Sequence, residues 1–260
     1  MEVDNSQSLY DAFAPDYDAA FAPGSLRAVY DGLAWSHVRR LLPPAPSVVV
    51  DVGCGTGRWA RRLIDAGYTV VGIEPSAGMC DALRGNVASD TFTLLPCGVD
   101  QAEVPRGSAA AVLAMGSLQY APDPHAALIR MAGWLRPGGL VCAHVDGVVA
   151  LVLELIRIGR TDDALQRLQE GHGVFSYGSS RASLHLFDRR ALVCAFEGAG
   201  LVRIETRGLL ITPSALGRAG SEAELHADPA RLQVLEQALS ASDVMTDAAK
   251  HIMAWGWRDA

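Results

Sequence analysis

The sequence predicts an α/β fold in which helices cover a doubly wound, mostly parallel sheet. Short apolar runs rich in β-branched residues alternate with amphipathic segments along the first 145 residues, a pattern typical of buried strands joined by helical crossovers. A glycine-rich loop follows the first strand, where this fold class binds ligands. Half of the 260 residues are apolar, which is enough to form a large core.

Each element of the core is predicted from its local pattern. Helices are predicted over Ser25–Leu42, about Arg58–Ala66, Pro124–Leu135 and Arg189–Gly198. Strands are predicted over Val48–Val52, Tyr68–Ile73, Phe92–Leu95, Ala110–Met115, Leu140–Val145, Leu201–Ile211 and His251–Trp257. Asp123 is expected to cap the third of these helices, and Arg136–Gly139 is expected to form a turn.

Two stretches, 147–187 and 213–249, interrupt the alternation. The first is expected to hold two helices, over Val148–Ile158 and Asp162–Glu170, and then a loop over Gly171–Leu186. The second contains one clear helix, Pro229–Leu239. Both stretches follow strands, so they are expected to be lids over the ligand site.

The chain is expected to form one compact domain. Residues 1–146 supply the N-terminal helices and the ligand-binding half of the sheet, and 147–187 form a helical lid. Residues 188–260 complete the sheet and include the second lid, 213–249.

The charge and composition favour a protein of the cytoplasm without nucleic-acid or membrane partners. The net charge of −7 repels phosphate, and Lys250 is the only lysine, which we interpret as codon bias in a GC-rich bacterial genome. Met1–Gln7 is polar and acidic, unlike a signal peptide, and the apolar run Val148–Ile158 is too short to cross a bilayer. Five widely spaced cysteines predict free thiols, with no metal site.

The most informative segment is the loop that follows the first strand, Asp51-Val52-Gly53-Cys54-Gly55-Thr56-Gly57. Its glycines allow a tight turn and a close approach of the backbone to a ligand. The third glycine comes four positions after the first, not five as in a dinucleotide fingerprint, and no Lys-Ser/Thr follows as in a P-loop. Asp51 would repel a pyrophosphate but suits a ligand that carries positive charge.

This loop resembles the DxGxGxG motif of the class I S-adenosylmethionine-dependent methyltransferases. Downstream segments agree with that family: Glu74 at the end of the second strand, Asp100, Gly116–Tyr120 after the fourth strand, and Leu135–Gly139 before the fifth. The segment from Tyr10-Asp11 to Tyr17-Asp18 is similar to the family's "YD…A…YD" opening. The resemblance is close over about 8–145 and resumes weakly at 188–211 and 250–257.

The resemblance implies a seven-stranded, Rossmann-like methyltransferase fold with lid insertions, which binds S-adenosyl-L-methionine and releases S-adenosyl-L-homocysteine. It also implies a set of cofactor-binding residues: Tyr17, Asp51, Gly53, Gly55, Gly57, Glu74, Met79, Asp100 and Met115. Glu74 would accept hydrogen bonds from the ribose diol, and Met79 would contact the adenine. Ala109-Ala110 departs from the family's Phe-Asp before the fourth strand. The Asn/Asp-Pro-Pro-Phe/Tyr motif of amino-methylating nucleic-acid enzymes is absent from the sequence.

The acceptor is expected to be a small organic molecule of bacterial specialised metabolism, methylated on O, N or C by a monomer or homodimer. Candidate catalytic residues are Asp146, His172 and Tyr120, which follow strands or lie in a lid. Candidate substrate contacts are Tyr10, Tyr120, Phe175 and Tyr177. His144 and His251 are expected to be structural.

Three alternatives remain open. A dehydrogenase with an unusual glycine loop is disfavoured by Asp51 and by the spacing of Gly57. A non-catalytic cofactor-binding or scaffold protein on the same fold is disfavoured by the complete set of cofactor motifs, which speaks against decay of the site. A methyltransferase that acts on protein or RNA is disfavoured by the net negative charge and the apolar lids.

Overall fold

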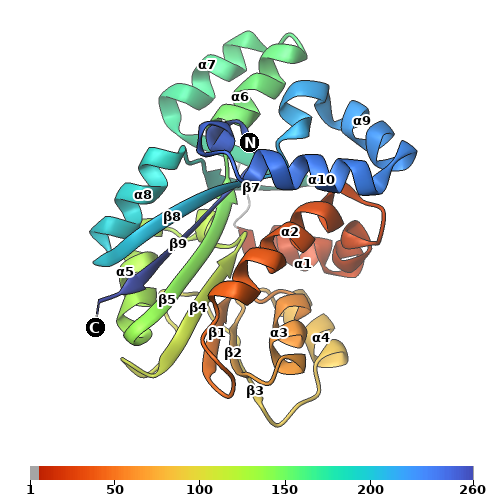
Figure 1. Ribbon diagram of the computed structural model, residues 1–260. Coiled ribbons are helices and arrows are strands. Elements are labelled where there is room, and N and C mark those ends of the chain that lie inside the picture. Colours follow the sequence, from red (N-terminus) through yellow and green to blue (C-terminus); the bar gives the residue numbers. More distant parts are fainter. Residues whose placement is uncertain (1–5, 260) are drawn as a thin grey trace.

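The computed structural model describes residues 6–259 and contains a central seven-stranded sheet in the order β3-β2-β1-β4-β5-β9-β8 (Figure 1). The strands are β1 (Val48–Val52), β2 (Thr69–Ile73), β3 (Phe92–Leu95), β4 (Ala109–Met115), β5 (Leu135–Asp146), β8 (Leu201–Leu209) and β9 (His251–Arg258). The first five run parallel, whereas β9 pairs antiparallel with both β5 and β8. The sheet thus has the predicted doubly wound, mostly parallel form.

Both faces of the sheet are covered by helices, as the continuous apolar strands predict. On one face α5 (Pro124–Trp134) and α8 (Arg189–Gly198) pack against side chains such as Val50 and Val112. On the other face α2 (Leu26–Leu41) and α3 (Arg58–Asp65) pack against the strand residues next to these in sequence, such as Val49. Because strand side chains alternate, one short strand contributes to two separate cores.

The segment predicted as a turn before the fifth strand is part of β5. Leu135 already pairs with Ala109, and the next paired residues are Leu140 and Ala111, so Arg136–Gly139 form an irregularity within the strand. Gly138 takes a left-handed backbone there, with φ of +71°. The Pro-Gly-Gly sequence still bends the chain, but it does so without ending the strand pairing.

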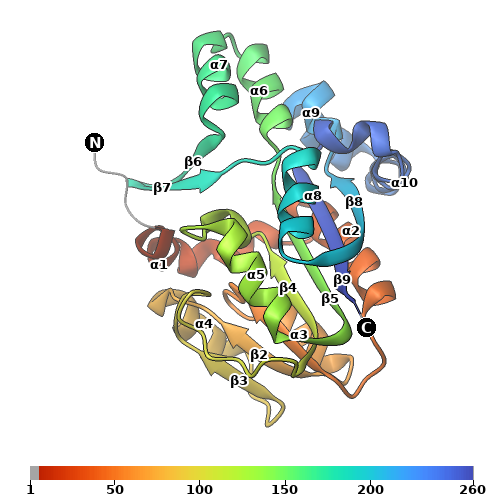
Figure 2. The same cartoon turned by 90° about the vertical axis from the view of Figure 1, so that its left-hand side faces the viewer.

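The first insertion contains the two predicted helices, α6 (Val148–Arg157) and α7 (Thr161–Glu170), and then a β-hairpin. Gly171–Leu186 was predicted to be a loop, and this prediction was wrong. β6 (His172–Tyr177) and β7 (Ser180–His185) pair antiparallel through a two-residue turn in which Gly178 has φ of +56°. The hairpin extends beside α1 (Ser6–Tyr17), as Figure 2 shows.

The second insertion is more helical than the sequence indicated. Besides α10 (Pro229–Ser240), it contains α9 (Thr212–Ala227), which is kinked at Gly217, and a 3₁₀ turn, η3 (Asp243–Ala248). The fully buried Glu236 accepts hydrogen bonds from the backbone N–H groups of Ile211 and Thr212 and from the Thr212 hydroxyl. This carboxylate binds α10 to the start of α9 and so fixes the insertion to the end of β8.

Three smaller elements complete the described residues: α4 (Ala77–Asn86), η1 (Asp18–Phe21) and η2 (Leu118–Tyr120). Within residues 6–259, no helix combines the length and the apolar character needed to cross a membrane. All five cysteines are free thiols.

Candidate cofactor and acceptor site

The glycine loop between β1 and α3 is tightly packed and allows no side chain at its first and last glycine. Gly53, Gly55 and Gly57 have φ values of +69°, +55° and +86°. A Cβ on Gly53 would lie 2.3 Å from the Ser117 Cβ, and one on Gly57 would lie 2.6 Å from a Val87 methyl carbon. The loop can therefore approach a ligand with bare backbone.

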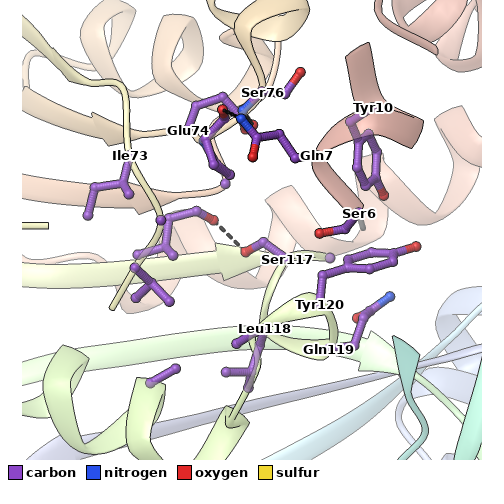
Figure 3. A pocket seen from close by; sticks show the side chains of 18 of the residues that line it. Ser6, Gln7, Tyr10, Ile73, Glu74, Ser76, Ser117, Leu118, Gln119 and Tyr120 are labelled. Carbon is purple, nitrogen blue, oxygen red and sulfur yellow. Dashed lines mark hydrogen bonds between the residues drawn. The ribbon is translucent and has the colours of Figure 1, made fainter. Parts of the chain in front are cut away.

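A cavity of about 580 Å³ opens beside this loop, at the carboxyl ends of β1, β2 and β4. Figure 3 shows Glu74, Ser117, Gln119 and Tyr120 around it, with Tyr10 of α1 close to Tyr120. Of the residues predicted to bind a cofactor, seven line the cavity: Tyr17, Gly53, Gly55, Glu74, Met79, Asp100 and Met115. Asp51 and Gly57 belong to the same loop but are not part of the lining.

Glu74 joins the glycine loop to the end of β2. Its Oε2 accepts a hydrogen bond of 2.9 Å from the Gly55 N–H, and its Oε1 accepts one of 2.9 Å from the Ser76 N–H. Burial raises the pKa of this carboxyl, and the two backbone bonds act in the opposite direction. Each carboxylate oxygen can still accept a further bond from a ligand hydroxyl in the cavity.

Asp51 lies directly beneath the loop and is 1 % exposed. Its Oδ2 has no hydrogen-bond partner among the described residues. Burial and the nearby Glu74 raise the pKa of Asp51 to about 7. A buried, unpartnered carboxyl of this kind fits a ligand that brings positive charge, as S-adenosylmethionine would.

Helix α1 contributes to the cavity wall and is attached at its middle and just past its end by the aspartates of the two Tyr-Asp pairs. Asp11 Oδ1 accepts hydrogen bonds from the Ser76 hydroxyl and the Gly78 N–H, at 2.6 and 2.9 Å. Just past the end of α1, Asp18 Oδ1 accepts one of 2.6 Å from the Thr56 hydroxyl. The tyrosines of these pairs were predicted to contact the ligands, whereas the anchoring role of the aspartates was not predicted, although both belong to the Tyr-Asp pairs.

Tyr10, Tyr17 and Tyr120 form an aromatic wall of the cavity, in which Tyr17 lies next to Gly55 of the glycine loop. The Tyr10 ring meets those of Tyr17 and Tyr120 edge to face, with centroids 6.3 and 5.4 Å apart. Burial is the main cause that raises the pKa of each of these three phenols, so they stay protonated at neutral pH.

Two of the predicted substrate contacts, Phe175 and Tyr177, lie behind this wall and not in the cavity lining. Phe175 stacks on Tyr10 with centroids 6.4 Å apart, and the Tyr177 hydroxyl donates to Asp16 on α1. The hairpin residues therefore hold α1 in place.

The three candidate catalytic residues are in different surroundings. Tyr120 and His172 line the cavity. His172 Nδ1 bonds to the Glu170 carbonyl at 2.7 Å, and its ring lies 4.6 Å from that of His185 across the hairpin. Asp146 is bonded to His251 Nδ1 at 2.8 Å, so the histidine expected to be structural is the partner of a candidate catalytic residue.

His144 and Gln119 are also close to the site. His144 is 5 % exposed, and burial followed by the charge of His251 lowers its pKa to about 3, so its ring is neutral. Gln119 is 3 % exposed, lines the cavity and has no hydrogen-bond partner for Oε1. Gln119 belongs to the segment Gly116–Tyr120 after β4, but it was not predicted as a site residue.

Comparison with known proteins places this site in a family. Residues 49–139 match the family described as "Methyltransferase domain". The chain is 33 % identical over 137 residues to methyltransferase-like protein 27 of Homo sapiens, covering 52 % of this chain and 55 % of that protein. It is 33 % identical over 129 residues to a tRNA U34 carboxymethyltransferase of Methylococcus capsulatus, covering 46 % and 40 %. The chain thus spans about half the length of these curated relatives or less.

The fold is similar to that of phosphoethanolamine N-methyltransferase 2 of Haemonchus contortus, solved with S-adenosyl-L-methionine. The TM-score is 0.63 at 16 % identity, over 96 % of this chain and 57 % of that one. The match identifies residues 49–139 as a methyltransferase domain, and the likeness to the solved structure shows that the chain has the same fold.

Proposed function

We propose that this protein is a methyltransferase that uses S-adenosylmethionine to methylate a small organic acceptor. The observation that carries the proposal is the arrangement of Glu74 and the glycine loop at one end of a single cavity, with Asp51 buried beneath the loop. Gly53 and Gly55 supply bare backbone, Glu74 supplies carboxylate oxygens for the ribose diol, and Asp51 supplies negative charge beneath the loop. Met79, Met115 and Tyr17 supply apolar surface, and Asp100 supplies a carboxylate for the adenine amino group.

The cofactor supplies a methyl group that its sulfonium charge already activates. The chain's own contribution is therefore to position the acceptor in line with that group and to exclude water, and positioning can lower a barrier by up to about 7–11 kcal/mol. The aromatic wall of Tyr10, Tyr17 and Tyr120 serves this purpose. His172 is a candidate base for an acceptor hydroxyl, because the bond from its Nδ1 to a backbone carbonyl leaves Nε2 unprotonated in the neutral ring.

Two features support a small acceptor. The far end of the cavity is bounded by α1 and by the β6–β7 hairpin, whose His172, Ser183, Leu184 and His185 contribute to its lining. The chain carries a net charge of −7, which does not favour a polyanionic partner. We further propose a role in bacterial specialised metabolism, based on the arginine-rich, nearly lysine-free composition.

An RNA acceptor is the second candidate, and the similarity to tRNA U34 carboxymethyltransferases favours it. One experiment separates the two. The purified protein is incubated with methyl-labelled S-adenosylmethionine and either a small-molecule extract or total tRNA from the same cells, and the products are analysed by mass spectrometry. We expect label in a small molecule that accumulates unmethylated in cells without the gene. Label in tRNA alone would refute the small acceptor, and label in neither fraction would refute the proposed activity.

A further inference from the structure

The last residue of β5 and the first residue of β9 form a fixed pair at the edge of the sheet where the cavity opens. Because the two strands are antiparallel, Asp146 and His251 are register partners. His251 Nδ1 lies 2.8 Å from Asp146 Oδ1. An ionised carboxylate can only accept, so Nδ1 carries the proton and donates. The imidazole is itself packed against the Tyr30 ring, with centroids 4.4 Å apart.

The Asp146 carboxylate remains accessible to solvent. About a third of its side chain, 32 %, is exposed, against 9 % for His251. Burial acts to raise its pKa, but the hydrogen bond and the charge of His251 outweigh this effect, so the pKa is lowered and the group is ionised at neutral pH. Of the two partners, the carboxylate is the one that a ligand can reach.

Asp146 is not part of the cavity lining, but it lies two residues beyond His144 on the same face of β5. The His144 ring lies close to Gly116, which lines the cavity. Burial is the main cause of the raised pKa values of Tyr10 and Tyr120, and the negative charge of Asp146 adds to both shifts. Both phenols are therefore within electrostatic reach of the carboxylate, and Tyr120 is also within reach of Arg27, whose charge acts on its pKa in the opposite direction. Since Tyr10 and Tyr120 also line the cavity, an acceptor that lies against them lies close to a fixed negative charge.

The charges around the cavity favour one class of acceptor. The lining of the cavity includes two carboxylates, Glu74 and Asp100. Among residues 6–259, no arginine or lysine belongs to this lining. Lys250 acts on the Asp146 charge, but Lys250 is exposed, so water screens it. A carboxylate next to tyrosine rings attracts a cation through both charge and ring faces, and it repels an anion.

We propose that Asp146, with Tyr10 and Tyr120, forms a subsite for a protonated amine on the methyl acceptor, and that His251 is the positioning residue of this carboxylate. This inference rests on the proposed methyltransferase function and names its acceptor class. A carboxylate that stays ionised is a weak base, so the subsite anchors the acceptor and does not remove its proton.

The test uses pairs of probes that share a ring and differ by an ammonium group: tyramine with 4-ethylphenol, and tryptamine with 3-ethylindole. Each is titrated calorimetrically into the protein, with and without S-adenosylhomocysteine. We expect each amine to bind wild type at least about tenfold more tightly than its neutral partner. Asp146→Asn keeps the shape and should bring this ratio close to one. Asp81→Asn removes an exposed carboxylate on α4 and should leave it unchanged.

The positioning role of His251 is tested by the same ratio, which a general loss of stability would not change. His251→Phe should lower the ratio, and His251→Gln, which retains a donor, should keep part of it. Equal binding of amine and neutral probe by wild type, no binding of either amine at millimolar concentration, or an unchanged ratio in Asp146→Asn would overturn the proposal. Failure of wild type to bind S-adenosylhomocysteine would instead refute the proposed function.

Discussion

Replacing Asp51 by Asn should stabilise the cofactor-free protein at alkaline pH. Asn has nearly the same shape as Asp but cannot ionise. The pKa of the buried Asp51 is raised to about 7 from an ordinary value of 3.8, mainly by burial, so keeping this group charged costs roughly 4 kcal/mol of folding free energy. The cost is absent below pH 4, where the carboxyl is protonated in both the folded and the unfolded chain. It grows as the pH rises from 4 to 7 and is constant above that.

The assay is urea unfolding of both proteins at pH 5 and at pH 8, without cofactor. The free energy of unfolding of Asp51→Asn relative to wild type should rise by about 2–3 kcal/mol between these two pH values, because only wild type must bury the charge. The comparison cancels every other titrating group that the two proteins share. A difference that does not change with pH, or that changes in the opposite direction, would refute the assignment of Asp51 as an uncompensated buried acid. The same substitution should weaken S-adenosylmethionine binding, since the cationic ligand loses its counter-charge.

Three further outcomes are expected. Glu74→Gln should weaken cofactor binding by roughly 1.5–3 kcal/mol for each charged hydrogen bond lost, as measured by calorimetry, and an unchanged affinity would show that Glu74 serves only the loop. Gly53→Ala should lower the thermal unfolding midpoint, because its Cβ would lie 2.3 Å from that of Ser117 at a φ of +69°, and the cost should be of order 1–3 kcal/mol. Gly85→Ala, inside α4 with open space around it, is the matched control and should be neutral or stabilising. Phe175→Ala should lower methyl transfer by up to about tenfold, because each aromatic pair with α1 contributes roughly 0.5–1.5 kcal/mol, whereas Val174→Ala on the exposed side of β6 should retain the activity.

The core of the fold was predictable because its signals are local. β1 and β3 begin and end at the residues predicted from their apolar runs, and α8 matches its predicted range. The hairpin was missed for the opposite reason. Its residues are polar, glycine-rich and only partly buried, and its strands are stabilised by contacts of Phe175 and Tyr177 with α1, which lies about 160 residues earlier in the chain.

The candidate site also combines residues that local motifs locate with a pair that they do not. The glycine loop and Glu74 could be located from motif spacing, because β1 and β2 are neighbours in both sequence and space. The pairing of Asp146 with His251 joins residues 105 positions apart. It depends on β9 entering the sheet antiparallel to β5, and no local pattern specifies that order or register.

Calorimetric titration of the purified protein with S-adenosylmethionine tests the central claim most directly. We predict binding at one site per chain, with proton release near neutral pH, because the cationic ligand lowers the pKa of Asp51 from about 7. Repeating the titration in buffers of different ionisation enthalpy measures that proton. Saturable binding with proton release in wild type, and without it in Asp51→Asn, is the expected result. No binding by wild type would contradict the account of the cavity as a cofactor site.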